Sequence, residues 1–406
     1  MTTLDEPAAR GPQAASAGPA VAPSRNRPAA PTRPARAARR PAPILVRQMR
    51  NGVEESVHRG DVVEVDVDGS LIRGIGDTDR LVNLRSCVKP FGVVALIEAG
   101  GIEAFDLQPA ELALMASSHS GEDLHVRTIQ ALYRRAGVSQ SLIATGSEGM
   151  PLDALTAARL ARDGEKASPL RHMCSGQHSV FILLARLKGW DPDGYWLDDH
   201  PAQVAYRAVI ARTFRTTPSR LKTGIDGCGV NTYAFPLREV ARAYAFLADP
   251  AAVPASDPRA SLAPGLLRVR DAMLAHPEMV AGTRDRLDTS LMKAAPGRVV
   301  SKGGMEALRG LAVLPGRRAG ANGSGSAGAT APATGIALKI EDGDGYERGT
   351  WSATVEVLAQ AGVLEAQAVR MLARYHRPVI LDPHGRVGAE AVPDFELAPL
   401  RELVSG

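Results

Sequence analysis

The feature that most constrains the fold is where strand-like patterns fall along the chain. Near the start, residues 62–67 alternate apolar and polar side chains, residues 68–69 predict a tight turn, and residues 70–76 can return as a partner strand. Late in the chain, residues 299–300 and 335–343 show further strand patterns. Segments that are far apart in sequence therefore both contribute strands.

Helical periodicity fills the centre of the chain and its end. It occurs in seven central segments and in two closing ones, at 109–117, 122–136, 152–162, 178–188, 201–214, 236–247, 264–276, 350–361 and 364–374. Strands at both ends with helices between them predict an α/β or α+β domain whose sheet is built from the two termini.

Residues 1–42 are rich in Pro, Ala and Arg and have almost no large apolar side chains. Such a segment cannot bury enough surface to fold, so we expect a disordered tail. The tail has seven Arg against Asp5 and Glu6, a net charge of +5, and the rest of the chain therefore sums to −1. Because a nucleic-acid-binding domain carries its own basic face, we expect no nucleic acid partner. Residues 316–334 are rich in Gly, Ala and Ser and predict a flexible insert.

The cysteine content and the length of the apolar runs indicate where in the cell the protein is expected. Three Cys in 406 residues argue against a disulfide framework and predict a reducing compartment, the cytoplasm. No apolar run approaches the ~20 residues needed to cross a bilayer, so we expect no membrane partner.

A polar stretch near the middle, residues 172–178, places two His, a Cys and a Gln in seven positions. The apolar run 180–185 follows it and predicts a buried helix, so the stretch is expected at the start of that helix. A second Gly-bearing loop, residues 226–229, carries Cys228. Cys174 and Cys228 either face each other or are two ordinary buried thiols, and composition alone favours the second reading.

Three Ser-x-x-Lys matches, which begin at Ser86, Ser219 and Ser290, place a hydroxyl one helical turn from an amine. A lysine that burial keeps neutral can take the serine proton, and the alkoxide can then attack a carbonyl. The match is weak because it occurs three times. Its surroundings favour the pair of Ser86 and Lys89. Pro90 limits the helix, so Lys89 is expected near a first-turn position, and the apolar residues that follow can bury the pair.

Two further segments offer polar groups. Residues 117–122 place three hydroxyls and His119 at a helix junction, where helix capping is the alternative role. Lys302 follows a strand pattern and precedes two glycines that permit close approach of a ligand, and a solvated turn lysine is the alternative. The Lys-Thr-Gly triplet at 222–224 matches an element of serine β-lactamases, but no strand pattern precedes it and we treat it as a chance match.

Together these segments resemble the L-asparaginase II family, the Rhizobium etli type of asparaginase. The likeness runs from about Pro43 to Leu372, and it is the order and spacing of modest motifs that make it specific. The matching segments are Arg85-Ser86-x-x-Lys89-Pro90, Ser118-His119-Ser120-Gly121-Glu122, Cys174-Ser175-Gly176-x-His178, Gly189-Trp190, Asp199-His200-Pro201, Asp226-Gly227-Cys228-Gly229, Tyr233-Ala234-Phe235-Pro236, Ala281-Gly282-Thr283, Ser301-Lys302-Gly303-Gly304 and Leu338-Lys339-Ile340-Glu341-Asp342-Gly343.

The resemblance implies a fold like that of serine β-lactamases and serine-dependent glutaminases, with an antiparallel sheet and with residues 43–406 as the catalytic domain. It also implies two neighbouring Ser–Lys pairs, which here are Ser86 with Lys89 and Ser118 with Lys302.

The resemblance further implies a zinc ion held by two cysteines and a lysine. The cysteines match Cys174 and Cys228, but this chain has Gln177 in place of the lysine. Because a neutral amide oxygen is a poor zinc ligand, we expect weak zinc binding.

The activity that the resemblance implies is hydrolysis of L-asparagine to aspartate and ammonia through a Ser–Lys acyl-enzyme. Arg85, His119, Gln177, His178 and Asp226 are expected to bind the substrate or to orient the loops around it. Two alternatives stay open: an amidohydrolase with another amide substrate, because Gln177 changes a residue beside the reacting group, and a non-catalytic relative that binds an amide ligand. We expect a small-molecule amide as the partner and a homodimer as the assembly.

Overall fold

The structure is a computed structural model that describes residues 41–145, 149–166, 168–316, 318, 331–345 and 347–397. Nearly all of the tail expected at 1–42 and most of the insert expected at 316–334 lie outside these residues. Within the described ranges, no helix combines the length and the apolar character needed to span a membrane.

One antiparallel sheet of eight strands organises the described chain. Its strands pair in the order β10-β11-β1-β2-β9-β8-β7, and β3 also pairs with β2. Their bounds are β1 Ile44–Arg50, β2 Val53–Asp66, β3 Leu71–Ile75, β7 Val299–Gly304, β8 Leu308–Val313, β9 Thr334–Ile340, β10 Val379–Leu381 and β11 Val387–Pro393. Early and late segments thus share one sheet, which confirms the mixed fold with a sheet built from both ends of the domain.

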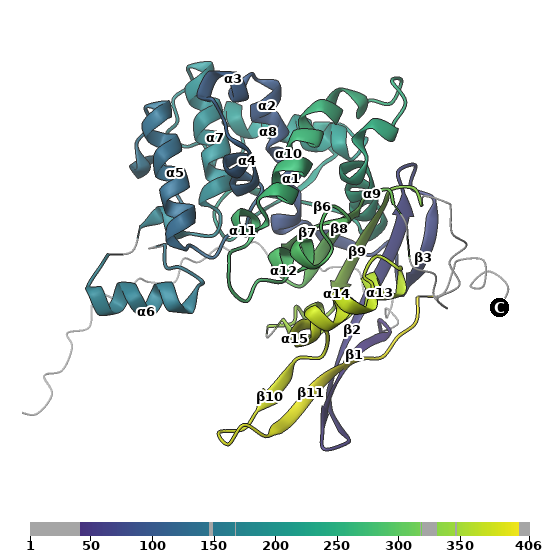
Figure 1. The fold of residues 1–406 in the computed structure, drawn as a ribbon. Helices are drawn as coiled ribbons and strands as arrows, with labels where there is room; N and C mark the ends of the chain where they lie inside the picture. The colour runs from purple at the N-terminus through teal and green to yellow at the C-terminus, as the bar shows by residue number, and fades with distance from the viewer. Residues whose placement is uncertain are drawn as a thin grey trace, which may run out of the picture. The chain divides into compact units, whose positions relative to one another are not determined.

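Two helices cover the two faces of this sheet (Figure 1). Side chains of β9 alternate between the faces, so Ile336 and Leu338 pack with helix α13 (Arg348–Gln360), whereas Ala337 packs with helix α9 (Leu237–Ala248). The small residues of β9 and β8 on the α9 side let this helix approach the strands closely.

Replacing Gly335 with alanine is expected to destabilise the protein strongly. An added Cβ would lie 1.8 Å from the main-chain oxygen of Ala241 in α9 and 2.3 Å from the main-chain nitrogen of Ala245. Neither atom can move without shifting the helix, so we expect a cost of ~3 kcal/mol, the upper range of overpacking. Thermal unfolding checks this, with Gly224→Ala as the matched strand control, since its Cβ would meet only Thr232 Cγ2 at 3.7 Å. Equal melting temperatures for the two variants would contradict the close packing.

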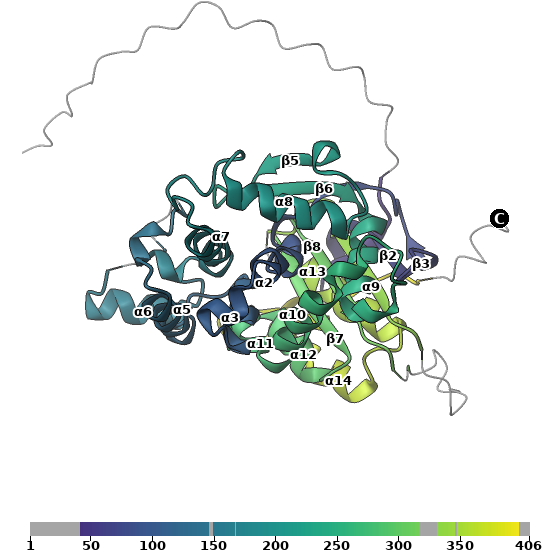
Figure 2. The same ribbon diagram turned by 90° about the horizontal axis from the view of Figure 1, so that it is seen from above.

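A helical region lies beside the sheet, and Figure 2 shows several of its helices gathered away from β2 and β3. The expected helical patterns fall on helices of this region, on α9 and on the closing helices to within about three residues at most ends. The bounds are α1 Lys89–Gly92, α2 Val94–Glu98, α3 Gly101–Phe105, α4 Pro109–Met115, α5 Asp123–Ala136, α6 Ala154–Asp163, α7 Ser175–Lys188, α8 Pro201–Thr213, α10 Ala263–Ala275, α11 Pro277–Val280, α12 Leu287–Ala294, α14 Ala366–Met371 and α15 Ala373–His376.

A second, three-stranded sheet lies next to the segment that carries Ser86. Strand β6 (Asn231–Pro236) pairs with β4 (Leu81–Asn83) on one side and with β5 (Lys222–Ile225) on the other. The Lys-Thr-Gly triplet at 222–224 is therefore part of a strand, which the sequence pattern did not indicate. This small sheet brings the 226–229 turn close to Ser86.

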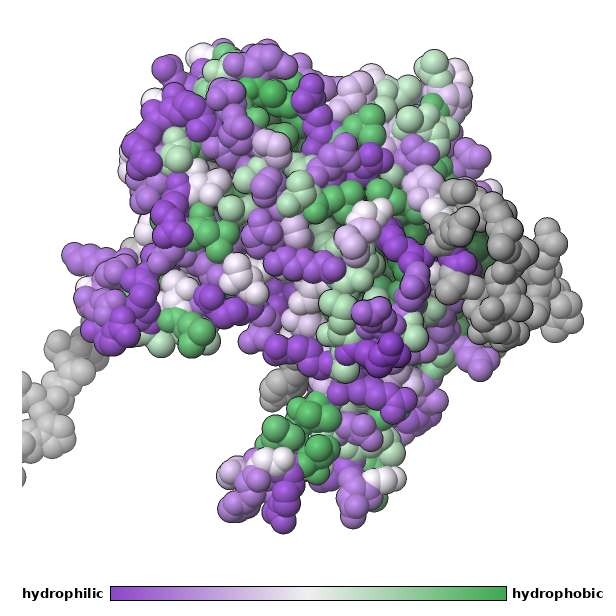
Figure 3. Space-filling model, in the orientation of Figure 1, coloured by the Kyte–Doolittle hydropathy of each residue, from purple (hydrophilic) through white to green (hydrophobic). Residues whose placement is uncertain are grey.

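The hairpin of β10 and β11 extends at one end of the main sheet and leaves apolar side chains in solvent (Figures 1 and 3). Val379, Ile380, Leu381 and Val387 are each between 45% and 63% exposed. A single chain does not test the expected homodimer, which stays a prediction.

Candidate active site

Three segments that are distant in sequence meet at the junction of the main sheet and the helical region. The first is a 3₁₀ turn at Arg85–Val88 that runs into α1, so Lys89 is the first residue of a helix followed by Pro90, as the sequence predicted. The turn begins with Arg85 in the left-handed region, at φ 47°. The Arg85 main-chain N–H donates to Thr232 Oγ1 at 3.0 Å, which ties this strained residue to the small sheet.

The second segment follows α4 and carries Ser118, and the third is β7, which carries Lys302. Lys302 Nζ donates to Ser118 Oγ at 2.9 Å, and Lys89 Nζ lies 3.3 Å from the same oxygen. The Ser118 main chain is itself fixed, since its N–H donates to the Val280 carbonyl at 3.0 Å. The structure therefore places one serine hydroxyl between two lysine amines.

Both lysines are buried beneath the surface of the site. Lys302 is 0% and Lys89 is 2% exposed. Burial lowers the pKa of Lys302 to about 7, because an ammonium loses its hydration, and the nearby charge of Lys89 lowers it further against the opposing effect of Asp288. Near neutral pH, a substantial fraction of Lys302 is thus a neutral amine that can accept a proton.

Asp288, on α12, fixes the strand end that carries Lys302. Its carboxylate accepts hydrogen bonds from Ser301 Oγ at 2.6 Å and from the Gly303 N–H at 3.0 Å, and it pairs with Arg309. Burial alone would favour the neutral acid, but the charges of Arg309 and Lys302 and these hydrogen bonds lower the pKa of Asp288 to about 2. The carboxylate therefore stays ionised.

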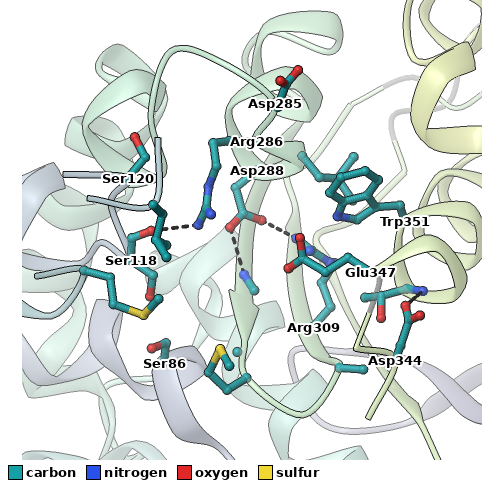
Figure 4. Close-up of a pocket in the computed structure, with 18 of the residues that line it drawn as sticks. Ser86, Ser118, Ser120, Asp285, Arg286, Asp288, Arg309, Asp344, Glu347 and Trp351 are labelled. Carbon is teal, nitrogen blue, oxygen red and sulfur yellow. Dashed lines mark hydrogen bonds and ion pairs between the residues drawn. The ribbon is translucent and has the colours of Figure 1, made fainter. Parts of the chain in front are cut away.

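A cavity of about 630 Å³ opens above these residues (Figure 4). Ser86 and Ser118 both line it, although they are only 5% and 7% exposed, whereas the two lysines lie behind the serines. No hydrogen bond joins Ser86 Oγ to any residue that the structure describes, and Lys89 Nζ instead contacts Ser118 Oγ, the Ser117 carbonyl at 2.9 Å and Cys174 Sγ at 3.3 Å. Ser86 and Lys89 thus belong to the same site, but no hydrogen bond joins the Ser86 hydroxyl to the Lys89 amine.

Cys174 and Cys228 do face each other. Cys174 precedes α7 and Cys228 lies in the turn between β5 and β6, and their thiols are in hydrogen-bonding contact. The bond from Cys228, with the charge of Lys89, lowers the pKa of Cys174, and the same bond together with burial raises the pKa of Cys228. Cys174 is therefore the more acidic thiol of the pair.

The residues around this thiol pair do not complete a metal site. The Gln177 amide nitrogen is turned to the Tyr206 hydroxyl, at 3.3 Å. Among the described residues, no group of three or more His, Cys, Asp or Glu side chains is arranged to hold a metal ion. Beside the two sulfur donors the chain thus offers a neutral amide, whose nitrogen is bonded to Tyr206.

The two histidines of the candidate set are fully buried. His119 Nε2 lies 2.8 Å from Ser175 Oγ, and its Nδ1 accepts the Gly121 N–H at 3.1 Å. His178 Nδ1 lies 2.5 Å from the Tyr195 hydroxyl. Burial lowers the pKa of both imidazoles, that of His178 to about 3, so both are neutral at physiological pH. The capping role considered for the serines is not seen, because Glu122 precedes α5 without a side-chain cap and Ser120 Oγ donates to its carboxylate.

Arg85 is held by Asp226, whose Oδ1 lies 3.0 Å from Arg85 Nη2. Neither residue lines the cavity. No sequence motif pointed to Arg286, Asp288 or Arg309, although all three line the cavity. Arg286 and Asp288 lie three and five residues after the matched 281–283 segment. Their charges, so close to a matched motif, could have identified them as candidate site residues.

A hydroxyl between two buried amines, open to a cavity, is typical of enzymes that use serine as a nucleophile against a carbonyl carbon. A family model agrees with this class: L-asparaginase II matches residues 46–392. The chain therefore belongs to the L-asparaginase II family, which confirms the resemblance, and the family indicates a hydrolase that acts on small-molecule amides. No curated protein matches the chain.

Proposed function

We propose that the protein hydrolyses the side-chain amide of L-asparagine to L-aspartate and ammonia through an acyl-enzyme on Ser118. The observation that carries this proposal is the 2.9 Å contact between Ser118 Oγ and Lys302 Nζ, an amine whose pKa of about 7 suits a general base. The family supplies the amide substrate class.

In the proposed reaction, Ser118 Oγ attacks the amide carbon and its proton passes to Lys302 Nζ. The tetrahedral intermediate collapses when Lys302 returns that proton to the leaving nitrogen, which departs as ammonia and leaves an aspartyl ester on Ser118. Water then attacks the ester while Lys302 takes its proton, and Lys302 passes that proton to Ser118 Oγ as aspartate leaves. The positive charge of Lys89, 3.3 Å from Ser118 Oγ, favours the alkoxide. Ser86 offers a second hydroxyl to the same cavity.

We further propose that residues 43–406 form one catalytic domain with the fold of serine β-lactamases and glutaminases. An antiparallel sheet between two helical layers supports this, as does a reacting lysine on the end strand β7 that faces a serine from the helical region.

Ammonia release from a panel of amides tests the proposed function. L-asparagine should be the best substrate, ahead of L-glutamine and simple amides. A strong preference for another amide would favour the alternative of a related amidohydrolase, and no release from any amide would favour a ligand-binding relative.

We expect weak zinc binding that a single substitution repairs. Two thiols and a neutral amide oxygen fall short of the three good donors of a stable protein zinc site, so the natural protein should bind zinc substoichiometrically. Gln177→Lys should raise the zinc content, measured by metal analysis of both proteins, and Cys228→Ala added to that variant should abolish the gain. Full zinc in the natural protein, or no gain in Gln177→Lys, would contradict this expectation.

A further inference from the structure

Three arginines line the cavity, and two of them are neutralised by carboxylates. Arg284 Nη2 lies 2.7 Å from Asp153 Oδ1 and 3.2 Å from Glu122 Oε2, and Arg309 pairs with Asp288. Arg286 differs, because it forms no ion pair with any carboxylate that the structure describes. Its hydrogen bonding to described residues is a single bond, from Nη2 to the Ser118 carbonyl at 2.9 Å.

Arg286 is also well placed with respect to the nucleophile. It is half-buried immediately before α12, and Figure 4 shows its side chain extended toward Ser118, between Ser118 and Asp288 in this view. A guanidinium carries five N–H donors in a planar fork, and the bond to Ser118 uses one. The remaining donors are available to an anion in the cavity, next to the reacting hydroxyl.

We propose that Arg286 binds the substrate carboxylate and thereby makes the enzyme specific for short ω-amides of amino acids. This inference rests on the proposed function and names the group that selects its substrate. A carboxylate and a guanidinium form paired, charge-assisted hydrogen bonds. Arg286 is half-buried and has no such partner among the described residues, so a substrate carboxylate can supply these bonds. Arg85, the candidate from sequence, already has Asp226 as its partner and lies off the cavity.

The bond to Ser118 also sets the length of the substrate. Because the guanidinium donates to the main chain of the residue that carries the nucleophile, a carboxylate bound to it is held close to the acylated carbon. Asparagine, with one methylene fewer than glutamine between its amide and its α-carbon, fits that short separation better.

The test compares two amides that differ in the carboxylate. L-Asparagine has it, and β-alaninamide has the same amide and amine without it. For the natural protein, kcat/KM should favour asparagine by about 100-fold or more. Arg286→Gln should remove most of that preference: kcat/KM for asparagine should fall by about 100-fold, while kcat/KM for β-alaninamide changes by less than about 3-fold. Arg286→Lys, which keeps the charge but not the fork, should retain an intermediate preference.

Arg270→Gln is the matched control, since Arg270 Nη1 also donates to a main-chain carbonyl, that of Ala248 at 2.9 Å, outside the site. It should leave both rates unchanged. L-Aspartate should raise the melting temperature of the natural protein and not that of Arg286→Gln, a readout that requires no turnover. Equal losses for the two amides in Arg286→Gln would show that Arg286 only holds the Ser118 loop, and would overturn the inference. A natural protein that releases ammonia from no amide would instead overturn the proposed function itself.

Discussion

Ser118→Ala is expected to lower kcat/KM for asparagine by at least about 1000-fold, with little change in the melting temperature. The hydroxyl is the nucleophile of the proposed reaction, and alanine removes one oxygen from a small side chain at the cavity wall. The loss should appear in kcat, because Ser118 Oγ is expected to contribute more to the transition state than to substrate binding. Ammonia release and thermal unfolding of the purified variant check both parts of the expectation.

The chain supplies matched controls in its other Ser-x-x-Lys serines. Ser219 is exposed, and Ser290 Oγ lies 3.0 Å from the Tyr375 hydroxyl, away from the cavity. Alanine at either position should leave turnover unchanged, whereas Ser86→Ala should lower it, because it removes the second hydroxyl that lines the cavity. Near-normal activity in Ser118→Ala would contradict the assignment of the nucleophile. A folded Ser219→Ala variant as impaired as Ser86→Ala would contradict the choice among the three matches.

Lys302→Met is expected to lower kcat/KM by about 1000-fold, within the range of lost general-base catalysis. Methionine has a similar length and no charge, so it can fill the buried space behind Ser118. The variant therefore separates the loss of the base from a loss of packing, and its melting temperature should stay close to that of the natural protein.

The pH dependence of kcat/KM provides a second test of Lys302 as the general base. The pKa of Lys302 is lowered to about 7, so the amine is protonated and inactive below that pH and neutral and active above it. For the natural protein, kcat/KM should rise with pH through about 7 and level off above it. The residual activity of Lys302→Met should lack this rise. A flat profile in the natural protein would contradict Lys302 as the base.

The strands that could be predicted are those whose own residues show alternation. Of the predicted strand segments, residues 62–66 lie in β2 and residues 335–340 lie in β9, at the centre of the sheet. Strands β1 and β11 pair with each other across more than 300 residues, and their polar, Gly and Pro residues give no strand pattern of their own. Their pairing comes from tertiary contacts, which a local pattern does not encode.

In the candidate site, too, some features could be predicted from local sequence and others depend on tertiary contacts. The start of α1 at Lys89 followed from Pro90, and the approach of Cys174 to Cys228 was one of two readings of their loops. The contact between Ser118 and Lys302 joins positions 184 residues apart, so only the family resemblance brought them together. Lys89 contacts Ser118 instead of Ser86 because of the 3₁₀ turn before α1 and the hydrogen bond from Lys89 to the Ser117 carbonyl. The Ser-x-x-Lys spacing predicts neither feature.

The location of the acyl group during turnover shows directly which residue is the nucleophile. The natural protein is mixed with L-asparagine, quenched in acid within milliseconds, digested and mapped by mass spectrometry. If Ser118 is the nucleophile, the peptide that contains it should carry one aspartyl group, and the same peptide of Ser118→Ala should carry none. An aspartyl group on Ser86 or on Cys174, or turnover of asparagine with no acylated peptide at any quench time, would contradict this assignment.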